Sequence, residues 1–163
     1  MENVEKLKKV QLTEHFSIGE VIKTRFATPD GNMPTPQALN NLKNICEHWL
    51  EPLREKYNQR YCEEEEGIVI NQGYRSVEVM EKMIRAGYKP SPTSNHLSGC
   101  AVDIRCLGPE QVYRYGCILI DIADESRQDF DELLAEHNAK GDYWLHLAVR
   151  PKDNRRKIKF LQG

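Results

Sequence analysis

A short loop followed by an apolar strand carries the most informative residues of the chain, Ser94-Asn95-His96-Leu97-Ser98-Gly99-Cys100-Ala101-Val102-Asp103-Ile104. Successive side chains of a strand point to opposite faces. A strand over residues 100–106 would therefore carry Asp103 on one face and a run of apolar side chains on the other. Asp103 shares its face with Ala101, whose small side chain leaves room for a ligand.

Two apolar segments near the C-terminus, residues 130–136 and 143–149, also have strand length. The turn-forming residues 138–141 between them predict a hairpin. In the second strand, alternation places His146 on one face beside an alanine and leaves the other face apolar. His146 is thus expected in the same kind of setting as the aspartate of the earlier strand.

Helices dominate the first half of the sequence. Ser17 and Glu20 form a capping-box pattern that opens a short helix. Thr35 and Pro36 predict the start of a longer helix, which should kink or end near Pro52. Further elements are expected as helices over 77–86 and 109–123 and as a strand over 67–71. Because helices come first and most strands come late, we predict an α+β fold with a small antiparallel sheet that carries the site and is flanked by helices.

The bulk composition fits one soluble domain spanning residues 1–163, with residues 1–11 as a charged, frayed N-terminal extension. Hydrophobic residues make up 39% of the chain and charged residues 29%. The formal net charge is -2, which gives no electrostatic reason to expect nucleic-acid binding. Basic residues gather over residues 150–159, where we expect a solvated tail.

Several features of the sequence indicate where in the cell the chain is made. No apolar stretch approaches the length of a transmembrane helix, and the N-terminus lacks the apolar segment of a signal peptide. The five cysteines show no paired metal-ligand spacing, and Cys100 and Cys106 fall on the apolar face of their strand. We therefore expect a reduced, cytoplasmic chain at synthesis, a monomer that does not bind membranes. A substrate outside the cell would require release or delivery by a phage-type route.

Three residues can form a metal site, namely His96, Asp103 and His146. Two imidazoles and one carboxylate leave a tetrahedral zinc ion with one open position, as catalytic zinc requires. Spacing alone does not separate this site from a structural histidine and a capping aspartate. The same residue types form the iron site of non-haem oxygenases, but those sites usually begin with His-x-Asp/Glu, whereas His96 and Asp103 are seven residues apart.

A resemblance favours the metal site. The pattern Ser94-x-His96-x-x-Gly99-x-Ala101-x-Asp103 resembles the signature of the D-alanyl-D-alanine metallopeptidases, which include zinc D-Ala-D-Ala carboxypeptidases, vancomycin-resistance D,D-dipeptidases and phage endolysins. Gly73-Tyr74-Arg75-Ser76 and Trp144-Leu145-His146 are similar to two further family motifs. The segments 12–16 and 50–54 are similar to the branch with phage-associated members, and the resemblance spans roughly residues 11–156.

The resemblance implies a fold like that of D,D-peptidases and hedgehog signalling domains. It implies Zn²⁺ as the cofactor, with His96, Asp103 and His146 as its ligands. Arg75 would hold the substrate or stabilise the oxyanion, and Ser94 would either contact the substrate or shape the ligand loop. The implied activity is that of a carboxypeptidase or endopeptidase, acting on a peptidoglycan stem peptide or a D-Ala-D-Ala-type peptide.

The general base is the point where the sequence departs from the family. Many members have a carboxylate three residues before the last histidine, where this chain has Tyr143. Glu136 ends a segment similar to Phe-Asp-x-Leu-Ile-x-Glu of the same branch, whereas Asp142 would share the strand face of His146 by alternation. We expect Glu136 to be the base, with Asp142 as the alternative. The departure also leaves open a metal-binding module of the same fold that binds cell-wall peptides with little or no turnover.

The remaining histidines and one loop residue receive no functional role from the sequence. His15 and His48 are expected to be structural or exposed, and His137 to face solvent near the hairpin turn. Asn32 lies in a loop with no evident chemistry.

Overall fold

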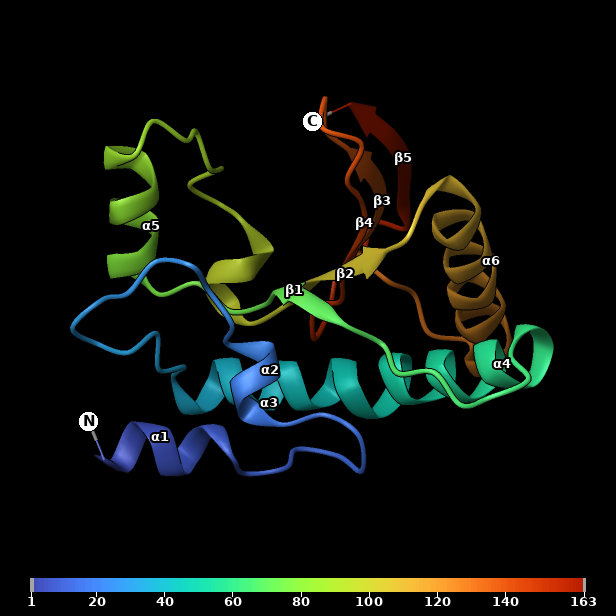
Figure 1. Cartoon of the computed structure of the whole chain (residues 1–163), viewed down its shortest axis with the longest axis horizontal. Coiled ribbons are helices and arrows are strands. Elements are labelled where there is room, and N and C mark those ends of the chain that lie inside the picture. The colour runs from blue at the N-terminus through green and yellow to red at the C-terminus, as the bar shows by residue number, and fades with distance from the viewer. Residues whose placement is uncertain (1, 163) are drawn as a thin grey trace.

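A five-stranded sheet lies at the centre of the computed structural model, which describes residues 2–162 (Figure 1). The strands are β1 (Ile70–Gln72), β2 (Ala101–Cys106), β3 (Glu132–His137), β4 (Tyr143–Ala148) and β5 (Lys157–Gln162). The helices are α1 (Glu2–Lys8), α2 (Ile18–Val21), α3 (Pro36–Ile45), α4 (Glu51–Tyr61), α5 (Val77–Arg85) and α6 (Pro109–Ser126), with a π-helical turn η1 (Cys46–Leu50) and a 3₁₀ turn η2 (Asn95–Ser98). The predicted α+β class is confirmed.

The strands follow the order β1-β2-β4-β3-β5 across the sheet. The predicted hairpin is present as β3 and β4, which pair antiparallel with Glu136 opposite Trp144. β5 pairs with β3 in parallel, so the sheet is mixed and the prediction of an antiparallel sheet is wrong in this respect. The pair is parallel because β4 ends beside Glu132 at the start of β3, and β5 begins beside the same residue.

The predicted basic tail is largely solvent-exposed, as expected, but it is not a free tail, because β5 begins at Lys157. Acidic residues that lie earlier in the chain hold this segment. Arg155 binds the buried carboxylate of Asp131 through Nε and Nη2 at 3.0 and 2.9 Å. Arg156 binds Asp124 at 2.7 Å and Asp129 at 2.9 Å. The basic run therefore neutralises acids that are distant in sequence, and a local view of its charge could not reveal them.

The two faces of the sheet differ in character. One face packs against helices α2, α3, α4 and α6 and contributes Val102, Ile104 and Cys106 of β2, Leu133 and Ala135 of β3, and Leu145 and Leu147 of β4 to the hydrophobic core. Trp49 of the long helix meets Phe130 edge to face across this core, with ring centroids 6.2 Å apart. The opposite face carries Asp103 and His146. The predicted alternation of β2 and β4 is confirmed.

The helix starts predicted from the sequence are confirmed. The capping box of Ser17 and Glu20 is formed, and the Thr35 hydroxyl accepts a hydrogen bond from the amide of Ala38 at 3.1 Å. The long helix does not end near Pro52, because the wider turn η1 places this proline at the start of α4, where an amide donor is not needed. Within residues 2–162, no helix is both long and apolar enough to cross a membrane.

Candidate metal centre and its groove

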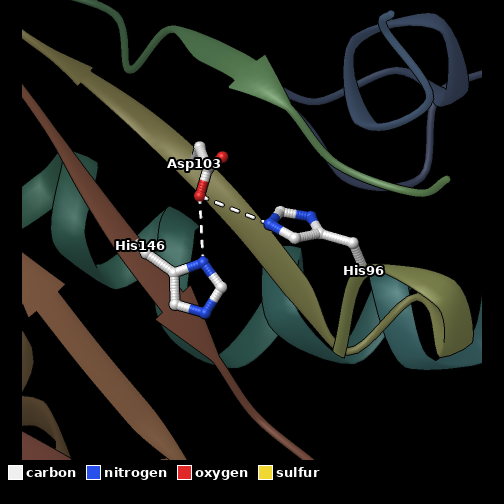
Figure 2. A group of neighbouring side chains, drawn as sticks. All are labelled: His96, Asp103 and His146. Carbon is white, nitrogen blue, oxygen red and sulfur yellow. Dashed lines mark hydrogen bonds and ion pairs between the residues drawn. The ribbon is translucent and has the colours of Figure 1, made fainter. Parts of the chain in front are cut away.

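Three elements bring the predicted ligands together, as Figure 2 shows. Asp103 of β2 lies opposite His146 of β4 in the antiparallel register, and η2 presents His96 from the side. Oδ1 of Asp103 lies 3.0 Å from Nδ1 of His146 and 3.4 Å from Nε2 of His96. One ligand atom from each residue lies within 4.8 Å of the other two, and all three side chains are buried.

The loop that carries His96 is fixed by its own sequence. The hydroxyl of Ser94 caps η2 and accepts a hydrogen bond from the amide of His96 at 3.2 Å. Gly99 ends the turn in the left-handed conformation with φ 72°, where a Cβ atom would lie 2.4 Å from the carbonyl oxygen of Ala38. Glycine is therefore required at this position. The contact of Ser94 lies within the loop, as expected for a residue that shapes the loop.

Each imidazole is oriented by a partner at its second nitrogen. Nδ1 of His96 donates to the carbonyl oxygen of Gly73 at 2.7 Å, which leaves Nε2 free to face Asp103. Nε2 of His146 lies 3.3 Å from a carboxylate oxygen of Glu132, and its Nδ1 faces Asp103. Metal-binding histidines almost always have such a partner, since it fixes the tautomer and the ring orientation.

The charges around Asp103 fit a cation. Burial opposes ionisation of Asp103, but the two histidines outweigh this effect and hold its pKa well below the usual range. Burial also opposes protonation of His146, yet the hydrogen bonds to Asp103 and Glu132 raise its pKa to about 9. Burial lowers the pKa of His96. Two imidazole nitrogens and a carboxylate oxygen form a donor set that suits Zn²⁺ and related divalent ions, so the residues present fit a metal.

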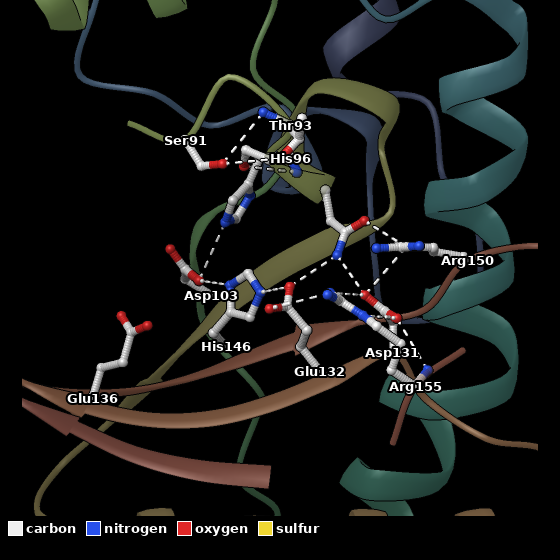
Figure 3. Close-up of polar contacts among 12 residues, drawn as sticks. Ser91, Thr93, His96, Asp103, Asp131, Glu132, Glu136, His146, Arg150 and Arg155 are labelled. Atoms are coloured by element: carbon white, nitrogen blue, oxygen red, sulfur yellow. Dashed lines mark hydrogen bonds and ion pairs between the residues drawn. The ribbon is translucent and has the colours of Figure 1, made fainter. Parts of the chain in front are cut away.

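A network of polar side chains extends from His146 to the C-terminal segment (Figure 3). The amide nitrogen of Asn95 donates to Glu132 at 2.8 Å and to Asp131 at 2.9 Å. Arg150 donates to the amide oxygen of Asn95 at 3.1 Å, and Arg155 holds Asp131 from the other side. Asn95 precedes His96 in the chain, so one network supports the surroundings of both histidines.

Arg75 lies beside the candidate metal ligands. Its Nη2 is 3.9 Å from Oδ2 of Asp103, and its guanidinium also donates to Gln72. The backbone around it is anchored twice. The amide of Arg75 donates to the carbonyl oxygen of His96 at 3.0 Å, and the buried side chain of Asn32 binds the carbonyl of Tyr74 and the amide of Ser76, each at 2.8 Å. Asn32 therefore holds the segment that presents Arg75, a role that the sequence did not reveal.

The two candidate bases, Glu136 and Asp142, lie in different environments. Glu136 lies opposite Trp144 in the hairpin and therefore on the site face, where it accepts a hydrogen bond from Nε1 of Trp144 at 2.5 Å. Burial and then the charge of Asp103 raise the pKa of Glu136. Asp142 precedes β4 in the hairpin turn, is exposed, and accepts a hydrogen bond from Asn138 at 3.0 Å. Figure 3 shows Glu136 on the same side of the sheet as Asp103 and His146.

A groove opens from the candidate centre along the site face of the sheet. It has a volume of about 940 Å³, and its lining includes Arg75, Asp103 and Glu136. The hairpin turn and Tyr88 of the loop after α5 also line it. The groove is thus lined by one of the three candidate ligands, Asp103, together with a cation and a half-buried carboxylate.

Three supporting residues, Glu132, Asn95 and Asn32, were not foreseen from the sequence. For Glu132 a signal was present, because it has the same strand parity as Glu136 and therefore shares the site face once the hairpin register is known. Asn95 and Asn32 act through contacts 37 and 42 residues away, which local patterns do not show.

Neither a protein-family model nor a curated protein matches the sequence. Among solved structures, the chain is similar to the crystal structure of the L-Ala D-Glu endopeptidase ChiX of Serratia marcescens, at 20% sequence identity and a TM-score of 0.41. The similarity covers 71% of this chain and 88% of that one.

Proposed function

We propose that this protein is a zinc-dependent peptidase that hydrolyses amide bonds in peptides of the bacterial cell wall. One observation carries the proposal. His96, Asp103 and His146 converge through the atoms that could bind a metal, while the second nitrogen of each imidazole is held by an acceptor. Polar residues that lie together by chance are not expected to have both imidazole rings held in orientation by such acceptors.

Zinc is the metal that the donor set favours, and it would act there as a Lewis acid and lower the pKa of a bound water to about 7. The ligands would be Nε2 of His96, a carboxylate oxygen of Asp103 and Nδ1 of His146. Gly73 and Glu132 would keep both rings in the ligating orientation.

Glu136 is the proposed general base. It accepts a proton from the attacking water and later returns that proton to the leaving amine. Its raised pKa suits this exchange, because a proton is transferred most efficiently by a group whose pKa lies near the working pH. The hydrogen bond from Trp144 holds the carboxylate in place on the site face.

Arg75 is the proposed stabiliser of the developing oxyanion. Its guanidinium is largely buried, and desolvation makes a fixed charge more effective than the same charge in water. The substrate class rests on the resemblance of the His96–Asp103 motif to D-alanyl-D-alanine metallopeptidases. Stem peptides and D-Ala-D-Ala termini are therefore the proposed substrates.

A second candidate function follows from Tyr143, which stands where many members of that family have their catalytic carboxylate. If Glu136 does not replace that group, the protein would keep the metal and bind cell-wall peptides without cleaving them.

Digestion of purified peptidoglycan distinguishes the two functions. The zinc-loaded protein should release fragments whose masses identify the cleaved bond, and protein with its metal removed by a chelator should release none. His146→Ala provides a matched inactive variant, since it removes a proposed ligand from the site face of the sheet, opposite the hydrophobic core. Binding of peptidoglycan without release of fragments would favour the second function.

A further inference from the structure

The groove contains cations that neither the metal site nor the proposed chemistry uses. Arg105 of β2 and Lys140 of the hairpin turn both line it. Arg105 has the same strand parity as Asp103, two residues further along, so their Cα atoms lie about 7 Å apart on one face. Its side chain is exposed and therefore available to a ligand.

These cations are not neutralised by the protein. Among residues 2–162, no carboxylate forms an ion pair within 4.0 Å of Arg105 or Lys140. The groove does contain other acids, but Glu136 is bound to Trp144 and Asp142 to Asn138. Most arginines of this chain have an acidic partner; Arg105 is one of four without one among the described residues.

The position of Arg105 restricts what it can bind. An extended peptide advances about 3.3–3.6 Å per residue, so a group bound by Arg105 belongs to a residue within about two positions of the bond held at the metal centre. Guanidinium groups bind carboxylates through two parallel hydrogen bonds, which makes them selective for this group.

We infer that Arg105, assisted by Lys140, binds a carboxylate of the substrate close to the scissile bond, so that the protein selects anionic peptides. This inference rests on the proposed function and narrows it. The carboxylate is either the free C-terminus of the peptide or an acidic group within it, and amidation of one at a time distinguishes these sources.

Binding of synthetic peptides tests the inference apart from turnover. The probe is the stem-type peptide L-Ala-γ-D-Glu-L-Lys-D-Ala-D-Ala, with free or amidated carboxylates, titrated by calorimetry into zinc-loaded Glu136→Gln protein. Amidation of the recognised carboxylate should raise Kd at least about 10-fold, as expected for loss of a hydrogen bond to a charged group. Arg105→Gln should raise Kd for the free peptide by a similar factor and leave Kd for the amidated peptide unchanged.

Arg85→Gln is the matched control, because Arg85 also has no acidic partner among residues 2–162 but lies on α5 outside this groove. It should change neither affinity. Equal binding of the free and amidated peptides, equal losses for both in Arg105→Gln, or binding of neither peptide overturns the inference.

Turnover by the wild-type protein separates this result from the proposed function. If the protein binds the free peptide through Arg105 but cleaves no cell-wall peptide, the proposed function fails and the inference stands. If free and amidated peptides are cleaved with equal kcat/KM, the function stands and the inference fails.

Discussion

Replacement of Glu132 by glutamine should weaken zinc binding although Glu132 is not a proposed ligand. Its carboxylate faces Nε2 of His146 at 3.3 Å and accepts a hydrogen bond from Asn95 at 2.8 Å. The substitution keeps the shape of the side chain and removes its charge. A neutral amide is a weaker acceptor, and it can also turn its NH₂ group toward the ring and favour the tautomer that protonates the ligating nitrogen.

The expected magnitude follows from comparable partners of metal-binding histidines, whose loss typically reduces metal affinity by about 10–100-fold. At about 1.4 kcal/mol per factor of ten, this corresponds to about 1.4–2.8 kcal/mol of binding free energy. The half-buried setting of Glu132 favours the full effect, because the contact is only partly screened by water. Competition with a chromophoric zinc chelator at constant pH measures the affinity of the metal-free protein directly.

Glu110→Gln serves as the control, since Glu110 pairs with Arg114 on the exposed surface of α6 and does not contact the site. Its zinc affinity should equal that of the wild-type protein. If Glu132→Gln retains wild-type affinity with its fold intact, the orienting role of Glu132 is refuted. If the circular dichroism of the variant differs from wild type, Glu132→Asp provides a second substitution that keeps the charge and shortens its reach.

Further predictions concern the base, the cysteines and acid stability. Glu136→Gln should retain zinc and lower turnover by roughly 10²–10⁴-fold, whereas Asp142→Asn should change turnover little, and the reverse pattern in a peptide-cleavage assay would assign the base to Asp142. Substitution of Cys100 and Cys106 by alanine should leave the zinc content measured by mass spectrometry unchanged, and loss of zinc from folded protein would contradict the strand parity. Burial opposes ionisation of Asp131, but its arginine and asparagine partners lower its pKa to about 2 from 3.8. Asp131 should therefore stabilise the fold by about 2 kcal/mol above pH 4 and lose this contribution as the pH falls toward 2, so Asp131→Asn should flatten the decline of unfolding free energy in this range.

The sequence predicted the parts of the fold that depend on local patterns. Alternation in β2 and β4 correctly placed Asp103 and His146 opposite the core. The helix starts at Ser17 and Thr35 were predictable because a cap involves residues only three positions apart. The convergence of the candidate ligands was predicted mainly because His96 and Asp103 resemble one family motif and His146 resembles a second motif far along the chain.

Features that depend on pairing between distant segments could not be predicted in this way. The strand character of β5 was hidden by its lysines, and the segment just before it forms ion pairs with acids between residues 124 and 131. Placement of Glu136 on the site face required the hairpin register. Alternation within β3 separates its two faces but does not show which of them lies on the same side of the sheet as His146 of β4. The contact of Glu132 with His146 follows from that same register.

Metal binding by the three converging residues is the central claim, and zinc stoichiometry tests it most directly. The purified protein, saturated with zinc and freed of excess ion, should contain about one zinc per chain, with X-ray absorption showing histidine nitrogens at about 2.0–2.1 Å. His96→Ala and His146→Ala should each lose that zinc while the hydrophobic core, which lies on the other face of the sheet, keeps them folded. Folded wild-type protein that binds no zinc, or histidine variants that bind it as well as the wild type, would contradict the account.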